Sequence, residues 1–562
     1  MFVWVCILAV LGPTLAQNAR RVELTQGPVV GYEDTTYNGV FSFYGIPYAT
    51  APTGRDKFKA PLPAPNWTEP LEATNDKIIC PQYYTNLLDD KNPSEDCLVA
   101  NVFVPNTTET NLPVLVHIHG GGFLIGYSNW EKPRQFVQSK HVIAITFNYR
   151  LGPHGFLCIG TENIPGNAGM KDQVAALRWV KENIASFGGN PENITLAGCS
   201  AGGGSVDLHM LSKITKGLFK HVIGQSGANV ASFVVQTDPI ENAKYYASNI
   251  NFTGDAFEAM EEFYLTISMD QLWGYSLLAN KDHAVKMSPC IERDVGVEMF
   301  LDDTPKNIIT SGNFVRYPMI YGYADMEGLF RIGEFEYWKD EMNRNFTQFI
   351  PPDLKFESAE EKEKMAQEIK QFYFGDKAVS NETILKYVDF LSDVIFVYPM
   401  QKAVTLQVEA GNNEVYLHVY SFTDDQTPYV PYTTVRGADH CAQSYAVFDD
   451  DYTRITPEYK AMKDKMREIW FDFMTTGNPT PPGSSIPTWT PARADRAPCM
   501  NLGKTIQMQE MYAKERTEFW DKIYNKHFRQ PVPPSVPSSS ASFSPILGIS
   551  IFVVVQFVSV LM

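Results

Sequence analysis

The chain has 562 residues, of which 44% are hydrophobic and 20% are charged, as in ordinary globular proteins. The formal net charge of −17 argues against a nucleic-acid-binding protein, because such proteins carry clustered lysine and arginine. The length allows a large hydrophobic core, and residues 20–525 contain neither an internal repeat nor a long linker.

The N-terminal segment has the pattern of a secretory signal. An apolar run at residues 2–11 is followed by small residues that end at Ala16, which predicts a signal peptide over residues 1–16. A buried strand is the alternative interpretation. Six sequons for N-glycosylation agree with secretion, although Asn193 directly precedes a predicted core strand; they are Asn66, Asn106, Asn193, Asn251, Asn345 and Asn381.

Short apolar runs then alternate with helical stretches. Residues 112–118 and 142–147 predict buried strands, and residues 173–184 have apolar side chains at helical spacing. Further strands are expected at residues 194–197, 222–223, 319–321 and 414–420. This alternation predicts an α/β fold with a mainly parallel sheet, helices on both faces, and reactive residues at the carboxyl ends of strands. The amphipathic helical stretch at residues 353–400 is expected to be a cap or insertion.

Residues 198–202 form a G-x-S-x-G pattern between a predicted strand and a predicted helix. In such a turn the serine, here Ser200, is held in a strained backbone, and the glycines allow the strand and helix to pack closely. The pattern alone is weak evidence, since roughly one chain in five of this length carries it by chance. A nucleophilic serine also needs a base, an orienting carboxylate and N–H donors.

Candidates for each of these groups occur in the chain. The glycine run at residues 120–122 follows the first predicted strand and leaves backbone N–H groups uncovered, as in an oxyanion hole. Asp325 and Glu327 follow a later strand and compete as the carboxylate. His440 is favoured as the base because it lies in a predicted loop.

Two other histidines are alternatives to His440. His418 falls within a predicted strand, where a packing role is more common, and His527 lies near the end of the domain.

The eight cysteines fall into three groups. Cys6 belongs to the predicted signal peptide, and Cys80 and Cys97 flank a short polar stretch that suits a local disulfide. Five cysteines remain, so at least one is expected to be free; they are Cys158, Cys199, Cys290, Cys441 and Cys499. None has metal-ligand spacing with a histidine, and neither a metal nor a cofactor is expected.

Several motifs in a fixed order resemble the type-B carboxylesterases. This family of α/β-hydrolases includes cholinesterases, juvenile hormone esterases and the catalytically dead neuroligins. The resemblance covers about residues 22–528, and its motifs lie at residues 44–49, 94–98, 148–152, 166–169 and 187–191. It implies the α/β-hydrolase fold and hydrolysis of a small-molecule ester.

The resemblance also implies roles for individual residues. It aligns Ser200 with the nucleophile, Glu327 with the triad acid and His440 with the base, in the chain order of the fold. It aligns Gly121, Gly122 and Ala201 with the oxyanion donors. It aligns Ser226 with a conserved serine near the acid, and Cys80 and Cys97 with the first disulfide of the family.

The chain departs from the family in two places. Cys199 stands before the nucleophile where most members carry glutamate or glutamine, and the later disulfides of the family are not evident. Between Cys80 and Cys97 there is no tryptophan of the kind that binds choline in cholinesterases, only Tyr83 and Tyr84. The chain therefore resembles insect α-esterase-like carboxylesterases. A cholinesterase and a neuroligin-like adhesion protein are the alternatives.

The C-terminal segment differs from the domain before it. We expect the catalytic domain to span residues 17–530, followed by a proline- and serine-rich stalk at residues 531–545. The apolar residues 546–562 and the small residues upstream are typical of a GPI-attachment signal, with a short membrane anchor as the alternative. The enzyme is thus expected to be extracellular, either secreted or attached to the outer cell surface.

Overall fold

The structure is a computed structural model that describes residues 18–83, 88, 90–276, 280–449 and 455–535. The predicted signal peptide (residues 1–16), Tyr84 and the apolar segment at residues 546–562 lie outside the described residues.

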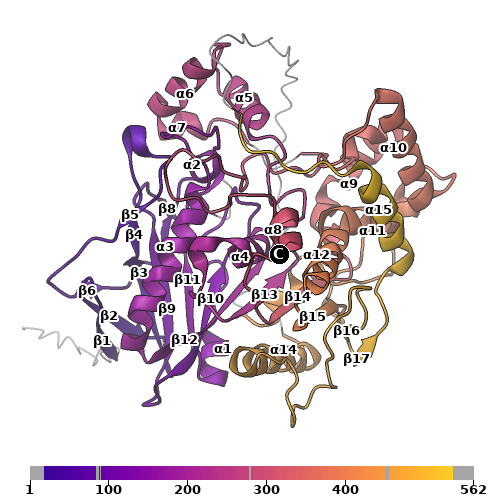
Figure 1. Ribbon diagram of the computed structural model, residues 1–562. Coiled ribbons are helices and arrows are strands. Elements are labelled where there is room, and N and C mark those ends of the chain that lie inside the picture. The colour runs from indigo at the N-terminus through magenta and orange to yellow at the C-terminus, as the bar shows by residue number, and fades with distance from the viewer. Residues whose placement is uncertain (1–17, 84–87, 89, 277–279, 450–454, 536–562) are drawn as a thin grey trace, which may run out of the picture.

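One large sheet forms the centre of the molecule (Figure 1), in the order β1-β2-β3-β9-β11-β10-β12-β13-β14-β15-β16-β17, with β6 beside β2. The neighbours from β11 to β16 are parallel, whereas β1, β2, β3 and β9 at one edge and β17 at the other run antiparallel. The strands of this sheet are β1 (Ala19–Glu23), β2 (Pro28–Glu33), β3 (Val40–Pro47), β6 (Leu71–Glu72), β9 (Val99–Pro105), β10 (Leu112–Ile118), β11 (Ile143–Phe147), β12 (Gly189–Cys199), β13 (His221–Gln225), β14 (Met319–Ala324), β15 (Val415–Tyr420), β16 (Cys499–Leu502) and β17 (Ile506–Gln509).

Two short strand pairs and a set of helices surround this sheet. The pairs are β4 (Ala49–Thr50) with β5 (Leu62–Pro63), and β7 (Ile78–Ile79) with β8 (Asn92–Pro93). The helices are α1 (Arg134–Lys140), α2 (Gly152–Phe156), α3 (Ala168–Asn183), α4 (Ala201–Leu211), α5 (Pro239–Asn249), α6 (Phe257–Thr266), α7 (Met269–Leu272), α8 (Pro305–Ser311), α9 (Phe335–Arg344), α10 (Ala359–Phe374), α11 (Ile384–Ser392), α12 (Tyr398–Glu409), α13 (Ala442–Tyr445), α14 (Pro457–Thr476) and α15 (Lys514–His527). In Figure 1, α5 to α7 gather at the top and α9 to α11 at the right.

Helices cover both faces of the sheet, as the continuously apolar strands predict. On β10, Val114 and Val116 belong to the core that includes α3, α4 and α12, whereas Leu115 belongs to the core that includes α1 and α14. Successive side chains of a strand point to opposite faces, so one strand contributes to both cores. The mainly parallel α/β sheet expected from the sequence is confirmed.

The helical stretch at residues 353–400, which is expected to be a cap or insertion, contains α10 and α11, and only its last three residues belong to the next helix. The helix α12, which begins at Tyr398, packs against β14 and β15 of the central sheet. Its apolar side chains Met400 and Val404 are fully buried in the core on that face. The sequence pattern could not distinguish this helix from the preceding α10 and α11, because all three are amphipathic or apolar.

Three disulfides cross-link the domain, and they join Cys80 to Cys97, Cys158 to Cys290, and Cys199 to Cys441. The first agrees with the family resemblance. The other two pairings were left open by the sequence, because their partners lie far apart in the chain and meet only in the fold. Cys499 is free and buried in β16.

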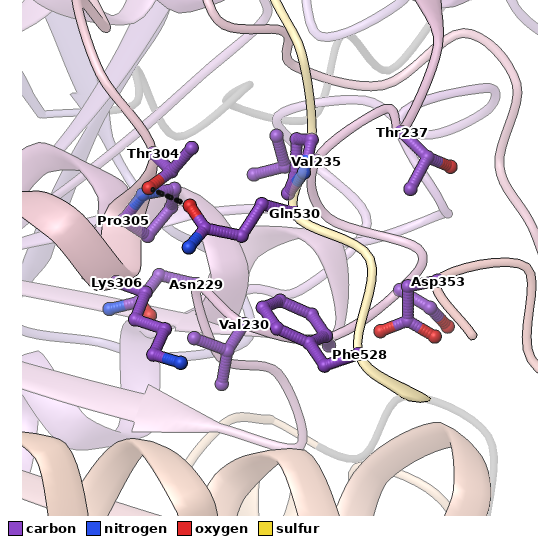
Figure 2. Close-up of a pocket in the computed structure, with 13 residues that line it drawn as sticks. Asn229, Val230, Val235, Thr237, Thr304, Pro305, Lys306, Asp353, Phe528 and Gln530 are labelled. Atoms are coloured by element: carbon purple, nitrogen blue, oxygen red, sulfur yellow. Dashed lines mark hydrogen bonds between the residues drawn. The ribbon is translucent and has the colours of Figure 1, made fainter. Parts of the chain in front are cut away.

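After α15 the chain returns across the domain. Figure 2 shows Phe528 and Gln530 beside the start of α8, where the Thr304 hydroxyl donates a hydrogen bond to the Gln530 side chain at 3.0 Å. They line a small pocket with Val230, on the segment that follows β13. Among the residues that the structure describes, no helix has the length and apolar character needed to cross a membrane.

Exposure separates the six sequons and yields a prediction. Five of the asparagines are exposed, whereas Asn193 is half-buried within β12. We expect glycans on the five exposed sites and none on Asn193, because a transferase must reach the side chain. Mass spectrometry of tryptic peptides after treatment with peptide N-glycosidase in ¹⁸O-labelled water measures occupancy at each site, because the released asparagine becomes an aspartate that carries the heavy oxygen. Full occupancy of Asn193 would contradict this assignment.

Candidate active site

Ser200 occupies a sharp turn between β12, which ends at Cys199, and α4, which begins at Ala201. Its backbone has φ 60° and ψ −124°, a conformation that is rare for residues other than glycine. Two backbone hydrogen bonds hold it there: the Ser200 N–H donates to the Gln225 carbonyl, and the Gly204 N–H donates to the Ser200 carbonyl, both at 2.9 Å. Strained residues of this kind persist only where the surrounding structure fixes them.

Glycine is required at the turn because the strands and helix approach closely. A Cβ atom on Gly202 would lie 2.0 Å from the Ile118 carbonyl oxygen, and one on Gly198 would lie 2.5 Å from the Gly202 backbone. Real Cβ atoms do not come so near to backbone atoms, which cannot move aside. The two glycines of the sequence pattern therefore allow the packing that was expected of them.

The glycine loop after β10 lies beside the turn. A Cβ atom on Gly120 would lie 3.1 Å from the Cβ atom of Ser200, so the two segments are in contact. Within the described ranges, the N–H groups of Gly121, Gly122 and Ala201 donate no hydrogen bond to another residue. These donors are free to bind an anionic oxygen near Ser200.

His119, at the start of this loop, contacts the Gly120 backbone and the Tyr149 ring. Its ring stacks on Tyr149 at 4.4 Å between centroids, and its Nδ1 lies 2.8 Å from the Gly120 carbonyl. Burial lowers the pKa of His119 to about 4, so the ring is neutral at physiological pH. A neutral ring whose Nδ1–H donates to Gly120 fixes the loop without adding charge to the site.

The imidazole of His440 contacts the carboxylate of Glu327, with 2.5 Å between Nδ1 and Oε2. The Glu327 side chain is fully buried and that of His440 is 10% exposed. Because a carboxylate accepts hydrogen bonds, it holds the proton on Nδ1 and leaves Nε2 as the basic nitrogen. The Nε2 atom is buried, and no described residue hydrogen-bonds to it, so it remains available to a hydroxyl group.

The other oxygen of Glu327 is also engaged. Its Oε1 accepts hydrogen bonds from the Ser226 hydroxyl and from the Ala324 N–H, the latter at 2.8 Å. The Gln443 amide donates to the Ser226 oxygen at 2.6 Å, which orients that hydroxyl toward Glu327. Gln443 could not be predicted from the sequence, because a single glutamine three positions after a histidine carries no recognisable pattern.

The competing residues lie elsewhere. Asp325 accepts a hydrogen bond from the Ala438 N–H at 2.8 Å, and burial raises its pKa to about 6. It therefore supports the loop that carries His440 rather than the imidazole itself. His418 is buried beside Gln225, and His527 lies beside the Lys355 carbonyl.

Aromatic side chains surround the histidine. Phe396 stacks on the His440 ring at 4.2 Å, and Phe330 lies against it at 4.9 Å. Phe233 packs on Phe396 at 5.6 Å. Phe330 is 48% exposed, so an apolar surface beside the histidine is open to solvent. Among the described residues no cluster of His, Cys, Asp or Glu could hold a metal ion.

The glycine loop, Ser200 and Glu327 follow the carboxyl ends of β10, β12 and β14, where α/β sheets bind their ligands. His440 is brought to the same edge by its contact with Glu327 and by the disulfide that joins Cys441 to Cys199. This arrangement can activate a serine for attack on a carbonyl carbon.

Comparison with known proteins gives consistent results. Residues 18–520 match the model of the Carboxylesterase family. Esterase FE4 of Myzus persicae is 30% identical over 89% of this chain and 92% of that protein, and bile salt-activated lipase of Bos taurus is 31% identical over 90% and 86%. The crystal structure of juvenile hormone esterase from Manduca sexta, with OTFP covalently attached, superposes with a TM-score of 0.79 at 28% identity, over 90% of this chain and all of that one.

The two acidic residues near His440 generate a prediction. We expect Glu327→Gln to slow the reaction of Ser200 with a fluorophosphonate by about a thousandfold to ten-thousandfold, because the imidazolium loses its carboxylate. Asp325→Asn is the matched control and should stay within about tenfold of the parent, since an amide oxygen can still accept from Ala438. The rate of covalent labelling measures both. The opposite ranking would assign the role to Asp325.

Proposed function

Because the chain belongs to the carboxylesterase family, we propose that it hydrolyses esters through an acyl-enzyme formed on Ser200. That it is a carboxylic ester hydrolase follows from the family. The contact between His440 and Glu327, within the same site as the strained Ser200, is the observation that carries the assignment of individual residues.

In the first step the Ser200 oxygen attacks the ester carbonyl carbon while His440 Nε2 takes the hydroxyl proton. The carbonyl oxygen becomes an oxyanion, which the N–H groups of Gly121, Gly122 and Ala201 stabilise. Collapse of this intermediate breaks the bond to the alkoxy oxygen, which leaves as an alcohol with the proton from His440.

In the second step His440 takes a proton from water, which attacks the acyl-enzyme. The same N–H groups stabilise the second oxyanion, and its collapse releases the carboxylic acid and returns the proton to Ser200. Glu327 stabilises the imidazolium in both steps and holds its Nδ1 proton in place. Its own position depends on Ser226 and Ala324, which bind the oxygen that faces away from His440.

The aromatic surface beside His440 favours substrates with an apolar group. Phe330 offers an exposed ring at the histidine, and burying an alkyl or aryl group against it removes apolar surface from water. We therefore propose neutral, apolar esters as the substrate class. The lack of a tryptophan between Cys80 and Cys97 agrees with this class rather than with choline esters.

The assignment of Ser200 is tested by its removal. We expect Ser200→Ala to lower kcat for 4-nitrophenyl butyrate by about a factor of 10⁵ to 10⁶, as the loss of a triad nucleophile does elsewhere. Mass spectrometry of the parent enzyme after treatment with a fluorophosphonate should place the label on Ser200. A variant that retains its turnover would show that another residue is the nucleophile.

We further propose that the enzyme acts outside the cell. Three disulfides suit an oxidising compartment, and the described chain runs through Pro531 and Pro533 toward the predicted anchor. The attachment residue is proposed to lie near Ser538 to Ser540, which are outside the described residues.

The anchor can be tested on intact cells that express the full chain. Phosphatidylinositol-specific phospholipase C should release esterase activity into the medium, because it cleaves the lipid that holds a GPI-anchored protein. Cells treated with buffer are the control. Activity that stays with the membrane, on a chain that mass spectrometry shows to retain residues 546–562, would identify a short membrane helix instead.

A further inference from the structure

The disulfide between Cys199 and Cys441 connects the two sides of the candidate site. Cys199 is the last residue of β12 and precedes Ser200, while Cys441 follows His440 and precedes α13. Their Cα atoms are 6.0 Å apart although 242 positions separate them in sequence. The proposed nucleophile and the proposed base are therefore each one residue away from the same covalent link.

The two segments differ in how firmly the rest of the fold holds them. Cys199 and Ser200 lie at the end of a central strand and the start of a buried helix, and backbone hydrogen bonds to Gln225 and from Gly204 fix the turn. This side of the site is rigid before any cross-link is added.

The histidine side comes from irregular backbone. The chain leaves β15 at Tyr420 and forms no named helix or strand again until α13, which begins at Ala442. Near His440 the loop is held by reciprocal hydrogen bonds between Ala438 and the segment of Asp325 and Met326, and by the ring contact with Phe396. Such loops are the least rigid parts of a fold.

We propose that the Cys199–Cys441 disulfide is a positioning element that sets the distance between His440 and Ser200, an inference that rests on the proposed function. Proton transfer requires Nε2 to come within hydrogen-bond reach of the serine oxygen, and a misplacement of about 1 Å can cost a factor of about 100 in rate. The link ties the loop directly to the rigid strand at the residues adjacent to both groups. Cys199 thus acts through its bond to Cys441 and makes no contact with substrate.

The Cys158–Cys290 disulfide provides a matched control. It is buried like the Cys199–Cys441 bond and joins positions 132 apart in sequence. Neither of its cysteines is adjacent in sequence to a proposed catalytic residue. Loop closure depends only weakly on length, so removal of either bond should lower the stability of the fold to a similar extent. Only the loss of the Cys199–Cys441 bond should affect catalysis specifically.

The test compares C199A/C441A and C199S/C441S with C158A/C290A, each in the full chain from a secreting host. At a temperature below every Tm, we expect the first two to lose about tenfold to a hundredfold in kcat and in the rate of Ser200 phosphonylation, with KM changed by less than about threefold. The control should keep kcat within about threefold while its Tm falls. A kcat that is unchanged in the first two, or that falls equally in all three, would overturn the proposal.

A second measurement covers variants that fail to fold. The parent enzyme is reduced stepwise, its free thiols are alkylated, and mass spectrometry quantifies each opened bond alongside activity. Activity should fall with opening of the Cys199–Cys441 bond, and retained activity with that bond open would overturn the proposal. Labelling of the parent separates the two ideas: if Ser200 takes no fluorophosphonate, the proposed function fails, whereas a labelled parent with an active C199A/C441A variant refutes only the positioning role.

Discussion

The buried carboxylate of Glu327 is the interaction on which the whole site depends. A charge removed from water is costly unless hydrogen bonds replace its hydration. Here the replacement comes from three parts of the chain: Ser226 after β13, the backbone of Ala324 at the end of β14, and His440 on the loop after β15. The hydrogen bond from His440 therefore offsets part of the free-energy cost of burying the Glu327 charge. The stability of the fold and the geometry of the site thus depend on the same contact.

The sheet explains why these groups meet. The neighbouring strands β10, β12, β13 and β14 are parallel, so their carboxyl ends lie along one edge and each contributes a different kind of group. The glycine loop follows β10, Ser200 follows β12, Ser226 follows β13 and Glu327 follows β14. Helices on both faces bury the strands, which keeps this edge rigid. The histidine arrives last, from a loop with little regular structure.

Much of this arrangement can be predicted from the sequence, for identifiable reasons. Residues 142–147 form a continuously apolar run that predicts a buried strand, and the glycine turn around Ser200 has few structural alternatives. The disulfides that join distant cysteines could not be predicted, since the local sequence around a cysteine does not show which distant cysteine lies beside it in the fold. Spacing alone could not favour Glu327 over Asp325, because only one residue separates them after β14; only the family resemblance favoured Glu327. Gln443 was missed for the same reason: its contact with Ser226 is purely tertiary.

The free Cys499 bears on how the chain matures. Its buried thiol has its pKa raised to about 12, and thiolate is the species that exchanges with disulfides, so in the folded protein this cysteine is inert. In an unfolded chain the same thiol would compete for every partner. Because synthesis proceeds from the N-terminus, all six cysteines that pair have been made before Cys499 emerges. The unpaired Cys499 therefore has the least opportunity to form incorrect disulfides during folding. Once β16 pairs with β15, its thiol is buried and can no longer exchange with the disulfides.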